Sequence, residues 1–199
     1  MERASTISLV IIVSVLCVAV SVSATSRTGS SDFIKSSCSS TRYPAVCVQS
    51  LSVYASAIQQ SPKQLAQAAL NVSLARARSV STFVSKLSHA KGMSSRDRAA
   101  IKDCVDNIGD SVDELTRSVQ ELGRTGKSGS FMWHVSNVQT WVSAALTDEN
   151  TCVDGFVTKG KVKDVVRGRI VNVAQVTSNA LALVNRYAHK SGTNNAANP

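Results

Sequence analysis

Apolar residues recur every three or four positions through most of the chain, and this periodicity predicts helices. The clearest run steps by 4, 3, 4, 3, 4 and 3 residues, which is typical of a helix packed at a shallow angle in a bundle. Its members are Ile101, Val105, Ile108, Val112, Leu115, Val119 and Leu122. One segment before this run and two after it show similar spacing, so the sequence predicts four amphipathic helices.

Capping residues and glycines indicate where these helices begin and end. Ser61 followed by Pro62 favours the start of the first helix. Glycine-rich breaks within residues 123–129 and 155–160 separate the later helices. Because short loops join consecutive helices, we expect an all-α fold, an antiparallel up-and-down four-helix bundle over residues 61–188.

Two further segments flank the predicted bundle. Residues 25–60 predict a short helical N-terminal extension, interrupted at Pro44. This extension is too apolar for a free arm, so we expect it to fold back on the bundle or on a partner. Residues 189–199 are polar and predict a disordered tail.

Residues 1–24 have the pattern of a secretory signal peptide. An apolar stretch of 16 residues runs from Ile7 to Val22 and ends at small residues, which predicts cleavage after Ala24. An uncleaved signal anchor is the alternative, but the stretch is short for a membrane span. We therefore expect a secreted protein that makes no membrane contact. Asn71 begins an Asn-Val-Ser sequon and is a glycosylation candidate.

Cleavage would leave four of the five cysteines, and an even number favours disulfides in a secreted chain. Cys104 and Cys152 lie at similar distances in sequence from the loop that joins their predicted helices. Antiparallel packing brings them to about the same level, within roughly one turn at a rise of about 1.5 Å per residue. This geometry favours a Cys104–Cys152 bond and leaves Cys38 to pair with Cys47 in the extension.

The chain carries 22 lysines and arginines against 13 aspartates and glutamates, a net charge of +9. Such an excess first suggests a nucleic-acid partner, but secretion argues against one. The second predicted helix instead carries an acidic stripe, Asp103, Asp106, Asp110 and Asp113, followed by Arg117. Its ordinary interpretation is a solvated face with pairing inside the bundle. The alternative hypothesis is that the stripe and Arg117 bind a charged protein partner.

Basic residues gather elsewhere, on the first and fourth predicted helices. They are Arg76, Arg78, Lys86 and Lys91 on the first helix, and Lys159, Lys161, Lys163, Arg167 and Arg169 around the fourth. The charge is therefore a local pattern of basic and acidic helices, not a uniform basic coat.

No constellation of residues predicts catalysis or a metal site. The three histidines lack the spacing of a metal-ligand set, and no nucleophile motif accompanies His134. Asp148, Glu149 and Asp154 cluster in sequence, but a packed bundle seldom offers the cleft that a glycosidase carboxylate pair needs. We interpret these acids as a solvated helix end. The sequence therefore predicts a binding protein without cofactor or metal, not an enzyme.

Three separated motifs resemble the plant invertase and pectin methylesterase inhibitor family. They are Phe33-Ile34-Lys35-Ser36-Ser37-Cys38 with Thr41-Arg42-Tyr43-Pro44 and Cys47; Thr140-Trp141-Val142-Ser143-Ala144-Ala145-Leu146-Thr147-Asp148 with Thr151-Cys152 and Asp154-Gly155-Phe156; and Thr177-Ser178-Asn179-Ala180-Leu181-Ala182-Leu183. The resemblance covers about residues 32–188. It implies a bundle and an extension bridged by the same two cysteine pairs. It also implies a secreted inhibitor of the plant cell wall (apoplast) that occludes an enzyme's substrate cleft in a one-to-one complex.

The resemblance favours the pectin methylesterase inhibitor branch of this family. Invertase inhibitors of the family tend to carry a Pro-Lys-Phe loop between the last two helices, whereas residues 157–162 here read Val-Thr-Lys-Gly-Lys-Val. The resemblance also implies that the later bundle helices contact the enzyme, and here these helices span about 94–123, 130–155 and 161–188. The acidic stripe lies on the first of them. We therefore predict a basic methylesterase as the partner. An acid invertase is the first alternative partner. The second alternative is a basic, non-inhibitory wall protein that binds anionic pectin through residues 159–169.

Overall fold

The structure is a computed structural model that describes residues 29–126, 131–156 and 161–196. The predicted signal peptide, residues 1–24, and the Val-Thr-Lys-Gly part of the last loop lie outside these ranges. Within them, every helix is too short or too polar to cross a membrane.

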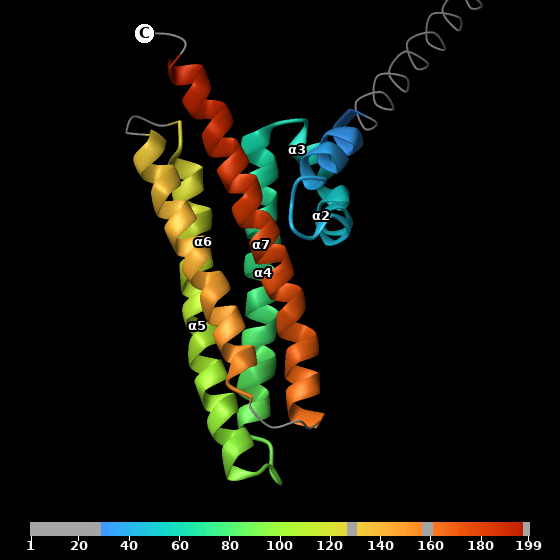
Figure 1. Ribbon diagram of the computed structural model, residues 1–199, viewed down its shortest axis with the longest axis vertical. Helices are drawn as coiled ribbons and strands as arrows, with labels where there is room; N and C mark the ends of the chain where they lie inside the picture. Colours follow the sequence, from blue (N-terminus) through green and yellow to red (C-terminus); the bar gives the residue numbers. More distant parts are fainter. Residues whose placement is uncertain (1–28, 127–130, 157–160, 197–199) are drawn as a thin grey trace, which may run out of the picture.

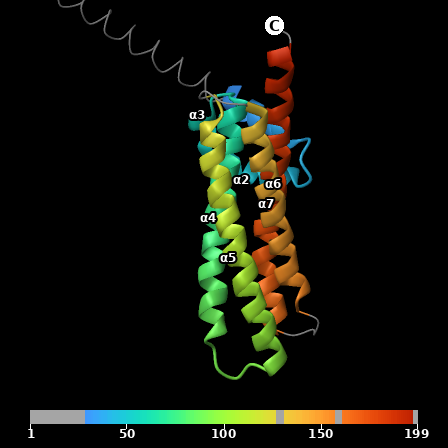
Figure 2. The same ribbon diagram turned by 90° about the vertical axis from the view of Figure 1, so that its left-hand side faces the viewer.

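Four long helices lie side by side and run alternately up and down (Figure 1). They are α4 (Pro62–Ser88), α5 (Ser95–Arg124), α6 (Phe131–Asp154) and α7 (Lys161–Ala196). Each helix packs on the next, and α7 packs back on α4, which closes the bundle (Figure 2). The described ranges contain no strand. The predicted all-α, antiparallel four-helix architecture is therefore confirmed.

Side-chain caps start two of these helices, and the start of α4 lies where the sequence predicts it. The Ser61 hydroxyl accepts a hydrogen bond from the backbone N of Gln64, and the Ser94 hydroxyl accepts one from the backbone N of Asp97. Each bond satisfies a backbone donor that has no partner within the helix. The first turns of α4 and α5 are fixed in this way.

The C-terminal helix is longer than expected. Where the sequence predicts a disordered tail from residue 189, α7 continues to Ala196. Extending an existing helix adds one hydrogen bond for each residue that is fixed, so a helix can continue without an apolar face. The polar composition of residues 189–196 therefore does not mark the end of the helix.

The predicted seam of α5 forms the centre of the bundle. Ile101, Ile108, Leu115 and Leu122 are fully buried, and the three valines between them are half-buried. Burial of each isoleucine or leucine contributes roughly 1.5–3 kcal/mol to folding. The alternating steps of three and four thus place every second seam residue on the bundle axis.

The N-terminal extension folds back on α4 and α7 (Figure 1). It comprises a helical segment over residues 29–38, then α2 (Pro44–Leu51), a 3-10 turn (Ser52–Tyr54) and α3 (Ala55–Ile58). The Asn179 side chain of α7 holds it: its oxygen accepts from the Tyr43 backbone N at 3.0 Å, and its amide donates to the Tyr43 carbonyl at 2.9 Å. The sequence predicts that the extension packs either on the bundle or on a partner, and the structure shows that it packs on the bundle.

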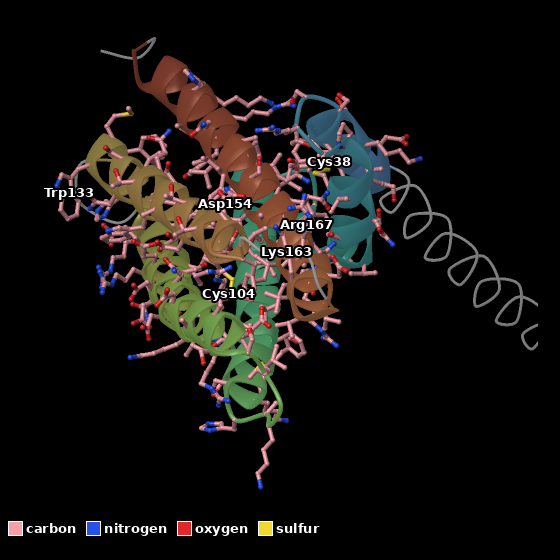
Figure 3. All side chains as sticks on the ribbon, turned by 60° about the horizontal axis from the view of Figure 1, so that its bottom comes forward. Cys38, Cys104, Trp133, Asp154, Lys163 and Arg167 are labelled. Carbon is pink, nitrogen blue, oxygen red and sulfur yellow. A yellow bond between two sulfur atoms is a disulfide. The ribbon has the colours of Figure 1, made fainter. Side chains whose placement is uncertain are left out.

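Both predicted disulfides are present. Cys38 pairs with Cys47 inside the extension, and Cys104 of α5 pairs with Cys152 of α6. All four cysteines are buried. Figure 3 shows the second bridge in yellow beside the Cys104 label, between the two helices.

Candidate protein-binding face

The acidic stripe lies on the outer side of α5. Its four aspartates are exposed, and so is Arg117, one turn beyond Asp113. Among the residues that the structure describes, none of the four takes part in an ion pair. The expected pairing inside the bundle is therefore not seen for this stripe, and its negative charge faces solvent.

A carboxyl pair extends the acidic surface from α5 toward α6. Burial first, and then the charge and hydrogen bond of Asp148 and the charge of Asp110, together raise the pKa of Glu114 to about 7 against a smaller lowering by Arg117. Burial likewise raises the pKa of Asp148. A protonated Glu114 can donate to Asp148, so one proton stabilises two carboxyls in contact. The negative charge of this face therefore increases as pH rises through about 7.

Glu121, near the C-terminal end of α5, connects this helix to the first turns of α6. Its carboxylate is 1% exposed and accepts from His134 Nδ1 at 2.9 Å, from the Asn137 amide at 3.1 Å and from Arg124 at 2.8 Å. The hydrogen bond from His134 is the largest cause that lowers the pKa of Glu121, and it outweighs the opposing effect of burial. This buried carboxylate is therefore ionised, and it ties the two helices together.

An exposed apolar pair lies at the start of α6. Met132 is 56% exposed and Trp133 is 59% exposed, and Trp133 lies at the margin of the bundle (Figure 3). Tryptophan and methionine are enriched in protein–protein interfaces, where tryptophan often supplies a large share of the affinity. This pair was not among the predicted site residues, although both residues fall off the apolar stripe of Phe131, Val135 and Val138.

The interpretation of Asp148, Glu149 and Asp154 as a solvated helix end is wrong for Glu149. Asp154 is exposed and Asp148 is half-buried, but Glu149 is 0% exposed. It occupies the inner stripe of α6, where the hydroxyls of Ser111 and Thr177 donate to its Oε1 at 3.0 and 2.9 Å. Burial raises the pKa of Glu149 to about 8. An enclosed carboxyl held by two hydroxyls is a structural group that no substrate reaches.

The glycosylation candidate and the possible metal ligands remain to be placed. Asn71 is exposed on α4, as an acceptor for glycosylation requires. The described residues contain no group of three or more histidines, cysteines or acids that could hold a metal ion. What the described surface offers is charge and apolar contact, which suits binding to another protein.

Comparison with known proteins agrees with this geometry. Residues 32–183 match the family described as plant invertase/pectin methylesterase inhibitor. Over 198 residues the chain is 52% identical to Pectinesterase inhibitor 9 of Arabidopsis thaliana, covering 96% of this chain and 97% of that protein. It is 51% identical over 174 residues to the 21 kDa protein of Daucus carota, covering 85% and 90% of the two chains.

A solved structure supports the fold. The crystal structure of a mutant form of a pectin methylesterase inhibitor from Arabidopsis superposes with a TM-score of 0.61 at 20% identity, covering 74% of this chain and 92% of that chain. At this identity the likeness concerns the fold alone. The sequence matches extend over nearly the whole chain, and on their strength the protein belongs to the plant invertase/pectin methylesterase inhibitor family.

Proposed function

We propose that this chain is a secreted, non-catalytic inhibitor of pectin methylesterase. It would cover the enzyme's substrate cleft in a one-to-one complex and so limit the de-esterification of cell-wall pectin. The observation that carries the proposal is the 52% identity to a protein named Pectinesterase inhibitor 9, over nearly the full length of both chains. The described surface supports it because it presents charge and apolar contact without a catalytic constellation.

The proposed contact face consists of α5 and the start of α6. Its unpaired acidic stripe would attract a basic enzyme surface, since complementary charge accelerates encounter and fixes orientation. The exposed Trp133 and Met132 would supply apolar contact at the same end of the bundle as Glu121. This arrangement combines long-range attraction with a local anchor.

We assign the protein to the extracellular space, in the cell wall. The N-terminal apolar pattern supports export. Two buried disulfides also suit an oxidising compartment.

Mixing the purified protein with a pectin methylesterase and, separately, with an acid invertase tests the proposal. We expect methylesterase activity to fall to its minimum at one equivalent of inhibitor, and invertase activity to stay unchanged. Loss of invertase activity alone would instead establish the invertase alternative. If both enzymes keep full activity, the chain is not an inhibitor of either.

A charge-reversal pair tests the contact face. Asp106→Lys with Asp110→Lys should weaken inhibition of a basic methylesterase by about 1–2 kcal/mol, roughly 5- to 30-fold, with a smaller effect at high salt. Asp32→Lys with Asp154→Lys is the matched control, because it makes the same charge change at exposed positions outside the stripe. Equal inhibition constants for the two double variants would show that the acidic stripe is only a solvated face.

A further inference from the structure

A groove of about 410 Å³ lies between α4 and α7, on the side of the bundle away from the acidic stripe. Arg76 and Ser79 of α4 form one wall, and Arg169 and Asn172 of α7 form the other. Its volume falls in the range of small-molecule binding sites, roughly 300–1,000 Å³. We call this feature the basic groove, because the two arginines are the charged residues among the described residues that line it.

Neutral groups hold both arginines in place. The Arg76 guanidinium donates to Asn172 Oδ1 at 2.6 Å and to Ser50 Oγ at 2.9 Å. The Arg169 guanidinium carbon lies 4.3 Å from the centre of the Phe83 ring, a cation–π contact. Among the described residues neither arginine takes part in an ion pair. The groove therefore presents two oriented positive charges that nothing described neutralises.

Gly168 leaves the groove open between these charges. A Cβ atom added at this position would meet nothing within 4 Å, and the backbone there is ordinary helix. Neither packing nor conformation requires a glycine, although glycine weakens a helix interior. What the missing side chain provides is space beside Arg169.

The lining chemistry identifies an anionic, hydroxyl-rich ligand. Two guanidinium groups suit carboxylates, which they bind through paired N–H donors. The Ser79 hydroxyl and the Asn172 amide can exchange hydrogen bonds with sugar hydroxyls. An acidic protein would need apolar anchors, but the apolar lining residues Val80 and Val173 are buried.

We propose that the basic groove binds the uronate carboxylates of de-esterified pectin. The inference rests on the proposed function, because this polyanion is what a pectin methylesterase produces. α5 and α7 occupy diagonal positions, each packed on both α4 and α6 (Figure 2). The family resemblance implies an enzyme contact on helix 161–188 as well, but the α4–α7 groove faces away from the contact proposed above on α5 and the start of α6. The inhibitor can hold the polymer and the enzyme at the same time, so it concentrates where de-esterified pectin has accumulated.

Calorimetric titration of the full chain with a de-esterified oligogalacturonate, and with its methyl-esterified form, tests this proposal. We expect only the de-esterified oligomer to bind. Arg76→Gln with Arg169→Gln should weaken binding at least tenfold. The matched control, Arg96→Gln with Arg98→Gln, removes two exposed arginines outside the groove and should have little effect. Equal losses for the two double variants would overturn the proposal in favour of non-specific charge attraction.

A second variant keeps the net charge and the arginines. Gly168→Gln places a side chain in the open space, so it should weaken oligogalacturonate binding at least tenfold without lowering the Tm. Unchanged affinity in a folded Gly168→Gln variant would overturn the assignment to this groove. Equal competition by inorganic phosphate, or by single-stranded DNA of matched charge, would overturn the assignment to uronates.

Methylesterase inhibition measured on the same variants separates this proposal from the proposed function. Variants that lose oligogalacturonate binding should inhibit the enzyme as well as the parent does. A parent chain that inhibits but does not bind the oligomer would refute the groove alone. A parent chain that binds the oligomer but does not inhibit would refute the proposed inhibition and leave the groove standing.

Discussion

Replacing Glu149 with glutamine should make the stability of the bundle much less dependent on pH. The Glu149 carboxyl is fully buried, and two hydroxyls donate to its Oε1. Its Oε2 is buried without a partner among the described residues. An ionised carboxylate at this site is therefore poorly compensated, and burial raises its pKa to about 8.

The sign and size of the effect follow from the two protonation equilibria. The folded protein keeps the Glu149 proton up to about pH 8, whereas an unfolded chain loses it near the ordinary value of 4.5. Between these values the folded state binds more protons, so stability falls as pH rises. With about 1.4 kcal/mol for each pKa unit, Glu149 alone lowers the free energy of unfolding by about 3–4 kcal/mol between pH 5 and pH 8. Typical domains have only about 5–15 kcal/mol in total.

Urea unfolding followed by circular dichroism at pH 5, 6.5 and 8 measures this effect. Glutamine keeps an oxygen that can accept from Ser111 and Thr177, so Glu149→Gln should match the parent within about 1 kcal/mol at pH 5. At pH 8 it should be more stable than the parent by about 3 kcal/mol. Glu114→Gln is the control: its carboxyl also has a raised pKa but is partly exposed, so most of the fall should remain. Parallel pH profiles for the parent and Glu149→Gln would refute the reasoning.

Two further substitutions test contacts that join separate elements of the fold. Cys152→Ser removes the disulfide to Cys104, which spans 48 positions, so it should lower the free energy of unfolding by roughly 2–5 kcal/mol. The variant should also lose inhibition at warm temperature, and thermal unfolding identical to that of the parent would count against the disulfide. Asn179→Ala removes both hydrogen bonds to the Tyr43 backbone, so it should cost about 1–3 kcal/mol. Limited proteolysis should then cleave the extension before the bundle, and equal cleavage of parent and variant would contradict that role.

The helices were predictable because their signals are local. The apolar spacing that predicts α5 lies within that helix, and Ser61 lies directly before the first residue of α4. The pairing of Cys104 with Cys152 followed from helix length and an antiparallel turn. The end of α7 was not predictable in this way, because continuation past residue 189 depends on cooperative helix extension and leaves no apolar pattern.

The candidate site was predictable only in part. The spacing of the acidic stripe indicated one exposed face of α5, and the structure places it there. The hydroxyl partners of Glu149 come from α5 and α7, so no spacing within α6 could reveal them. The Arg76–Asn172 contact likewise joins helices that are remote in sequence. Features that depend on two or three helices meeting in space require the structure.

Two buried carboxyls limit the pH range in which the bundle is most stable, Glu121 on the acidic side and Glu149 on the alkaline side. Glu121 has a lowered pKa, so its contribution is present above its ordinary pKa and is lost as pH falls through the lowered one. Glu149 has a raised pKa, so stability is lost as pH rises toward about 8. Together they favour a mildly acidic medium, and the two disulfides favour an oxidising one. The disulfides support the proposed secretion independently of the N-terminal pattern.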